Sequence, residues 1–312
     1  MAITLLEHAK LHATRLQMGV VETFARESII LARMPFMEVA SDSYSFSREQ
    51  TLGGAAFRAL NSEYTEKTGT LDKVTENLAV LGSVSDTDRV LVRTSAGGIN
   101  DTRAVFDSMK AKAVALKFTR TVIKGNVATT PLEFDGWQER CIGEQLIAAG
   151  STGGGDALSL AVLDEAIDAV NGTPDLIVMS KVMARRMSVG ARLAAVAGDL
   201  NYTIDEFGRR VTRYNGIEVG IIDRDEENDL ILDFDEECPG GGGDTGTSMY
   251  IIKFGERTHC CGLRCGDITV EDLGIKNNVS YRTLIEFICG QAIFHPRSVA
   301  RLYGISDAAI VA

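Results

Sequence analysis

The first hydrophobic pattern along the chain has the period of an amphipathic helix. Across residues 3–33, apolar side chains recur every three to four positions and therefore share one helical face. Pro35 ends the pattern, because proline removes a backbone donor that a continuing helix needs. We expect a helix in two pieces whose apolar face comprises Leu5, Leu6, Ala9, Ala13, Leu16, Val20, Val21, Phe24 and Ile30.

From residue 44 the period changes to that of a β-strand, and a second strand-like run follows at residues 74–81. Between the two runs lies a polar stretch with the Gly53–Gly54 pair and Gly69. The pattern predicts an extended hairpin, and a two-stranded hairpin alone is marginally stable in water. A partner, such as another subunit, is expected to pack against it. The alternating residues are Tyr44, Phe46 and Arg48 in the first run, with Val74, Leu78 and Val80 expected on one face of the second.

A long helix is predicted after this hairpin. Asn100 and Asp101 are candidate N-terminal caps, and Gly125–Asn126 ends the pattern. At 1.5 Å per residue the helix would span roughly 36 Å. Its expected apolar face comprises Val105, Met109, Ala113, Leu116 and Ile123, and its basic strip comprises Lys110, Lys112, Lys117, Arg120 and Lys124.

The second half of the chain alternates between helical and strand-like patterns. Residues 157–170 and 181–197 have helical periodicity, and residues 175–180 form a short apolar run typical of a buried strand. Strand-like patterns follow at 216–223, 248–254, 267–272 and 280–288. The tail, residues 292–305, is predicted to be a final strand followed by an irregular end. This mixture indicates an α+β protein.

Composition narrows the possible partners of the chain. The formal net charge of −11 over 312 residues makes it a poor direct binder of nucleic acid, because such binding depends mainly on Lys and Arg. No apolar run reaches the ~20 residues needed to cross a bilayer. The N-terminus lacks the pattern of a secretory signal, so we expect synthesis in a cytoplasm. The six cysteines are expected to be free thiols there.

The sequence contains two groups of potential metal ligands. His8 and His12 have helical i, i+4 spacing, but Ala9 stands where the zinc-protease motif has its Glu. The other group is His259, Cys260, Cys261 and Cys265, with Cys238 upstream. Adjacent cysteines on a strand point to opposite faces, and no second ligand couple follows. We expect neither group to bind a metal.

The remaining motifs also favour structural roles. The acidic run 223–237 resembles a calcium loop only in part, because Leu230 stands where that loop needs glycine. We expect a solvated loop there. The glycine tracts 153–155 and 240–243 are expected to be mobile surface loops, and the second lacks the lysine of a phosphate-binding loop. No GxSxG motif is present. The sequence therefore predicts no enzyme, no cofactor and no catalytic, cofactor-binding or metal-binding residues.

A resemblance to a known family rests on ordered segments. Residues 34–81 resemble the corresponding stretch of major capsid proteins of tailed double-stranded DNA phages, the Hong Kong 97-like family. Residues 92–126 are similar to the lead-in and long spine helix of that family. Residues 134–141, 205–223 and 281–305 match its remaining segments in order. The resemblance covers essentially the whole chain.

The resemblance implies a specific architecture and function. It implies an N-terminal arm (1–43), an extended loop (44–82), a peripheral domain with the spine helix (83–140), an axial domain (141–265) and a return to the peripheral domain (266–312). Hexamers and pentamers would form an icosahedral virion shell that encloses DNA without sequence-specific binding. Portal, scaffolding and decoration proteins are further expected partners, and no membrane is involved. Some relatives form a Lys–Asn crosslink, but none is predicted for Lys67 or Lys73.

Three alternatives are weighed from the sequence. One is another phage structural protein, such as a tail or connector component, which would form rings or tubes; the order of arm, loop and spine helix argues against it. An encapsulin-like nanocompartment shares the fold and encloses enzymes, and the nucleic-acid content of particles would distinguish it. A metal-dependent enzyme would use His259 with Cys260 and Cys265, and tightly bound zinc would reveal it.

Overall fold

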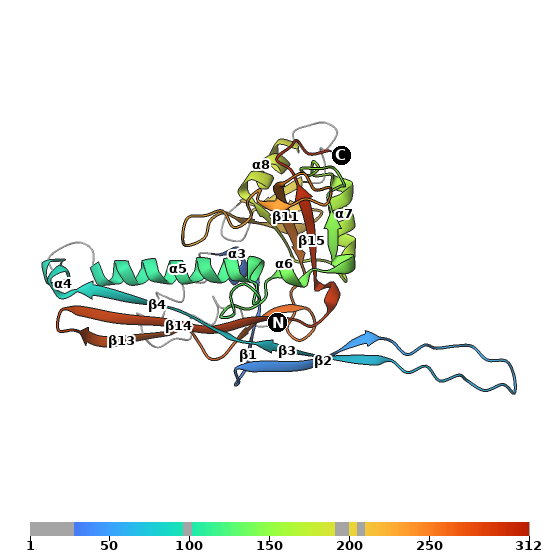
Figure 1. Ribbon diagram of the computed structural model, residues 1–312, viewed down its shortest axis with the longest axis horizontal. Coiled ribbons are helices and arrows are strands. Elements are labelled where there is room, and N and C mark those ends of the chain that lie inside the picture. Colours follow the sequence, from blue (N-terminus) through green and yellow to red (C-terminus); the bar gives the residue numbers. More distant parts are fainter. Residues whose placement is uncertain (1–27, 96–101, 191–199, 205–209, 312) are drawn as a thin grey trace.

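The computed structural model describes residues 28–95, 102–190, 200–204 and 210–311. Two β-sheets and a projecting hairpin organise these residues (Figure 1). The predicted helix at 3–33 lies mostly outside the described residues, which begin just before helix α3 (Ile29–Arg33). Within the described chain, none of the helices is both long and apolar enough to span a membrane.

The first sheet is built around one long strand. Strand β14 (Ser280–Ile293) pairs with β4 (Ala79–Asp88) on one side and with β13 (Thr269–Lys276) and β12 (Cys260–Arg264) on the other. Strand β1 (Phe36–Glu38) extends the sheet beyond β12. The long helix α5 (Thr102–Lys124) runs alongside β4 and β14 (Figure 1).

The second sheet forms a separate layer beside the end of α5 (Figure 1). Its strand order is β5–β15–β11–β6–β9–β8–β7, and β10 (Glu236–Glu237) pairs with β11. Helices α7 (Leu160–Ala169) and α8 (Lys181–Gly190) belong to this layer. The strands are β5 (Leu146–Ala148), β6 (Leu176–Ser180), β7 (Leu200–Ile204), β8 (Arg210–Tyr214), β9 (Ile217–Ile222), β11 (Asp244–Ile252) and β15 (Val299–Ile305).

Helix α5 has the predicted length but buries a different face from the one expected. Val105 and Met109 are 44% and 58% exposed. The buried apolar side chains are Ala111, Val114, Ala115, Phe118, Val122 and Ile123, so Ile123 is the one member of the expected face that is fully buried. The expected face was wrong for Val105 and Met109, in the first half of the helix. The helix ends at Lys124 as predicted: Gly136 donates to the Gly125 carbonyl (2.7 Å), and a Cβ on Gly125 would lie 2.3 Å from the Phe134 oxygen.

Two predicted strands have different extents in the structure. The run 74–81 is divided at Leu78 between β3 (Thr70–Asn77), which pairs with β2 (Ser43–Thr51), and β4, which joins the first sheet. The tail 292–305 contains the end of β14, the short 3₁₀ helix η2 (Pro296–Ser298) and β15. In both cases the chain changes sheet within the run that was expected to form one strand.

Sheet membership does not follow continuous segments of the chain. Strand β12 (260–264) pairs in the first sheet. Strand β15 (299–305) lies between β5 and β11 in the second sheet. The chain therefore crosses between the layers more often than linear segments suggest.

Candidate functional site

The most prominent feature of the molecule is the hairpin formed by β2 and β3. Its strands pair from Ser43↔Asn77 to Thr51↔Thr70. Beyond this ladder, residues 52–69 extend past the rest of the chain and form the hairpin tip (Figure 1). Phe57 and Leu60 are fully or almost fully exposed, at 107% and 95%. Exposed large apolar side chains in such a group mark an interaction site.

Among the described residues, the side-chain hydrogen bonds and ring contacts of residues 53–69 are local. The Arg58 guanidinium lies 5.2 Å from the ring centroid of Tyr64 and donates to the Ser62 carbonyl at 3.1 Å. These contacts join residues within the tip and do not connect it to either sheet. The tip therefore has no core of its own, as the sequence pattern predicted.

The base of the hairpin, by contrast, is firmly held. Glu76 on β3 is 4% exposed and accepts two bonds from the Arg140 guanidinium, one of them at 2.5 Å. Arg140 also donates to the Asp135 carbonyl at 3.1 Å. A paired, hydrogen-bonded burial of this kind satisfies both charges. The pair fixes the direction in which the hairpin leaves the body.

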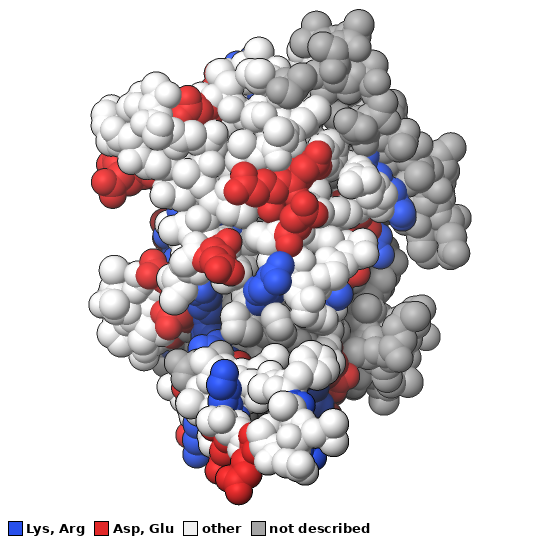
Figure 2. Space-filling view, turned by 90° about the vertical axis from the view of Figure 1, so that its right-hand side faces the viewer, with Lys and Arg blue, Asp and Glu red and all other residues white. Residues whose placement is uncertain are grey.

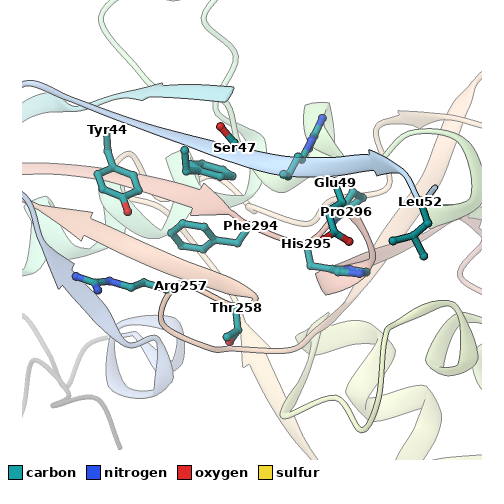
Figure 3. Close-up of a pocket in the computed structure, with 11 residues that line it drawn as sticks. Tyr44, Ser47, Glu49, Leu52, Arg257, Thr258, Phe294, His295 and Pro296 are labelled. Atoms are coloured by element: carbon teal, nitrogen blue, oxygen red, sulfur yellow. The ribbon is translucent and has the colours of Figure 1, made fainter. Parts of the chain in front are cut away.

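An aromatic contact supports the opposite strand. The Phe46 ring on β2 lies 4.5 Å from the Phe294 ring, with Tyr44 about equally close to both at 6.1 Å. These residues line a groove of about 510 Å³ between the hairpin and the residues that follow β14 (Figure 3). His295 and Pro296 line the same groove. The hairpin base thus packs directly on the segment that joins the two sheets.

A second apolar surface lies at the opposite end of the molecule (Figure 1). Helix α4 (Arg89–Ser95) and the first half of α5 adjoin there. Five large apolar side chains on these two helices are exposed. This surface, the α4–α5 surface, comprises Val90, Leu91, Val105, Phe106 and Met109. Since the hairpin tip and the α4–α5 surface lie at opposite ends, the two cannot meet within one chain.

The acidic run 223–237 docks on the second half of α5, so the expectation of a solvated loop was wrong for these residues. Arg120 pairs with buried Asp225 at 3.4 Å. The last turn of the helix contributes Lys124, 3.1 Å from Asp235 and 3.7 Å from Glu236. The predicted basic strip is therefore largely an intramolecular ionic contact that connects α5 to the second sheet. Lys117 adds contacts to Glu226 and Glu133 at 3.2 and 3.5 Å.

The candidate ligands of the sequence do not converge on one point. Cys260 and Cys261 are buried on opposite sides of β12, in different apolar clusters. Burial raises the pKa of both thiols to about 12, which keeps them protonated. In the described part of the chain no group of three potential ligands is placed to hold a metal ion. His8 and His12 lie outside the described residues.

Backbone hydrogen bonds account for the other two motifs. Asp225 accepts the N–H groups of Glu227 and Asp229, both at 2.9 Å, so its carboxylate closes a tight turn. In the glycine tracts, Gly154 donates to the Gly241 carbonyl at 2.8 Å. A backbone hydrogen bond therefore joins the two glycine tracts.

At the end of the molecule that carries the hairpin, the acidic side chains lie mainly over the second sheet, whereas acidic and basic side chains mix in the lower part of the view (Figure 2). Figure 2 views the molecule from the hairpin tip and shows acidic side chains gathered over the layer of the second sheet. Helix α7 exposes Asp164, Glu165 and Asp168. Such a surface repels phosphate groups rather than binding them.

Solved structures place this architecture among shell-forming proteins. The capsid of an empty GTA particle has a TM-score of 0.61 at 14% identity, covering 90% of each chain. Microbacterium phage Oxtober96 gives a TM-score of 0.61 at 13% identity, covering 89% of this chain and 90% of the other. The SrpI encapsulin from Synechococcus elongatus PCC 7942 gives 0.63 at 13% identity, covering 91% and 89%. The fold is therefore the Hong Kong 97-like capsid fold, as predicted.

The sequence defines the family within this class. Residues 14–173, more than half of the chain, match the family of the major capsid protein GP7. The chain belongs to this major capsid protein family. It is a structural protein of the virion shell and not an enzyme, which confirms both predictions. None of the curated proteins matches the sequence.

Sequence reasoning found the hairpin but missed the α4–α5 surface and the docking of the acidic run. A signal for the second was present: acidic residues 223–237 and the α5 basic strip have opposite charge. No local signal identified the α4–α5 surface, because the exposure of Val105 and Met109 depends on how distant segments of the chain pack around α5.

Proposed function

We propose that this capsid protein assembles as hexamers and pentamers into an icosahedral shell around phage double-stranded DNA. The observation that carries the proposal is the hairpin tip, on which Phe57 and Leu60 are fully or almost fully exposed in the described chain. Adjacent subunits would bury the tip of one copy on the α4–α5 surface of the next. A head-to-tail contact of this kind closes into rings when the rotation permits.

The domain division belongs to the same proposal. The extended loop (44–82) would bridge subunits, the first sheet with α5 would form the periphery of each ring, and the second sheet would form its centre. Residues 1–43 would act as an arm that contacts other copies. Portal, scaffolding and decoration proteins would join the shell at its vertices, interior and surface.

The shell would enclose DNA without binding it tightly. The net charge of −11 disfavours tight binding of phosphate. A shell of such acidic subunits would allow packaged DNA to move during loading and release.

An encapsulin-like compartment is the second candidate, and the match to the SrpI encapsulin favours it. Both functions need the same tip contact. The contents of the particles separate them, since double-stranded DNA supports the capsid and an enclosed enzyme supports the compartment.

Electron microscopy of the purified full-length chain tests the proposal. We expect closed polyhedral particles, with pentamers and hexamers visible after class averaging. Sedimentation measures the fraction of chain in particles. A monodisperse monomer under every salt and concentration condition, with its thermal unfolding intact, would contradict the proposal.

A further inference from the structure

Two segments pass between the layers at the same place. Residues 253–259 connect β11 of the second sheet to β12 of the first, and residues 294–298 connect β14 of the first sheet to β15 of the second. Backbone bonds hold these segments together: Lys253 donates to the Ser298 carbonyl at 2.9 Å, and Phe294 donates to the His259 carbonyl at 3.1 Å. We call these two segments the joint.

Each segment of the joint carries one histidine, and the rings lie 6.2 Å apart. His295 caps η2, because its Nδ1 accepts the backbone N–H of Arg297 at 3.1 Å. A neutral imidazole has one N–H, so acceptance at Nδ1 leaves the ring proton on Nε2, which lies 3.4 Å from the side-chain amide of Asn171. His259 Nδ1 lies 3.3 Å from the Ser298 hydroxyl. Protonation of His295 would replace the accepting Nδ1 with a donor and remove the cap.

The surroundings of the joint are mostly cationic. Arg297 is fixed by bonds from its guanidinium to the Ala169 and Asp168 carbonyls, at 2.9 and 3.0 Å. Lys253 is fixed by its ammonium bond to the Asn171 carbonyl at 2.9 Å. These bonds prevent either cation from turning away from the rings. The charged groups facing the two rings are Lys253, Arg297, Arg257, Arg48, Glu49 and Asp175.

Burial is the main cause that lowers the pKa of both rings. Lys253 and His295 lower the pKa of His259 further, while Asp175 opposes them. Arg297 and Lys253 lower the pKa of His295. A folded-state pKa below the unfolded value means that the neutral rings contribute stability above about pH 6.5. That contribution is lost as the pH falls through the folded-state pKa.

We propose that the joint is an acid-sensitive hinge in which protonation of His295, beside His259, releases the η2 cap and loosens the connection between the two sheets. The effect reaches the hairpin, because Phe294, next to His295, packs 4.5 Å from the Phe46 ring at the base of the hairpin. Acid would therefore weaken the packing at the base of the hairpin and would not act directly on the hairpin tip. The proposed hinge lies within one folded subunit, so it does not depend on whether the shell is a capsid or an encapsulin-like compartment.

Hydrogen–deuterium exchange of the full-length chain tests this proposal, with rates divided by the intrinsic rate at each pH. We expect amides of residues 294–298 to lose about fivefold protection as the pH is lowered stepwise from about 7.5 through the folded-state pKa of His295, as loss of one cap implies. His295→Asn keeps a non-titrating acceptor and should stay protected at both pH values. His295→Ala lacks the cap and should show the lower, about fivefold reduced protection at both pH values.

Amides of the buried strand β6 serve as the internal reference and should not respond. The proposal is overturned if the wild-type segment keeps its protection at low pH. It is equally overturned if His295→Asn loses protection to the same extent as the wild type, because the change would then not arise from this ring.

Discussion

Replacement of residues 52–69 by Asn-Gly should abolish shells while the subunit core remains folded. Thr51 and Thr70 are paired, so a two-residue turn of this kind can close the ladder without strain. The replaced residues belong to neither sheet and to none of the buried apolar clusters. We expect sedimentation and electron microscopy to detect no closed particles, and the free energy of unfolding to change by no more than about 0.5 kcal/mol.

Point variants distinguish apolar contact from loop length. Phe57→Asp with Leu60→Asp should prevent assembly, since both side chains would be buried between copies. Glu63→Gln with Glu66→Gln changes the charge of the same tip and should leave particle yield nearly unchanged. Shells at normal yield from the Asn-Gly chain would show that the hairpin tip is not an assembly contact.

The second large effect is expected at the base of the hairpin. Glu76→Ala should lower the free energy of unfolding by about 3 kcal/mol, because it leaves the largely buried Arg140 without its carboxylate. Denaturant unfolding of the unassembled chain measures the loss. Asp72→Ala is the matched control on the same strand. Its partner Arg48 lies 3.1 Å away and both side chains are more than a third exposed, so we expect at most about 1 kcal/mol.

Assembly should respond to the same change, since the pair sets the direction of the hairpin. Glu76→Ala particles, if they form at all, should dissociate at lower denaturant concentration than Asp72→Ala particles. If particles of the two variants dissociated at the same denaturant concentration, the Glu76–Arg140 pair would not be the contact that sets the direction of the hairpin.

The sequence pattern predicted the elements whose periodicity is contained within one continuous segment. The alternation around Phe46 identified β2, and the run 102–124 identified α5 because its helical period is uninterrupted. Which face of α5 is buried depends on strands distant in sequence. Phe36 on β1 packs 6.0 Å from Phe118, and Gly262 on β12 leaves room for the Phe36 ring, since a Cβ at Gly262 would lie only 2.5 Å from that ring. Neither contact has a signal within α5 itself.

The same limit applies to the features that carry function. The hairpin tip was recognisable because residues 52–69 lack any apolar period that could form a private core. The division at Leu78 was not, since residues on both sides of it continue one strand pattern while pairing with different sheets. The joint depends on two segments that are distant in sequence, and only the fold brings His259 close to His295.

The central claim is that the hairpin tip of one subunit is buried on another copy. A photo-crosslinking amino acid at Phe57, activated in assembled particles, tests it most directly. We predict dimer-sized products in which position 57 of one copy is joined to α4 or to the first half of α5 of another copy. Particles assembled from a mixture of isotope-labelled and unlabelled chains show that the crosslink joins two different copies. Crosslinks found only within single chains, or none despite intact particles, would contradict the account.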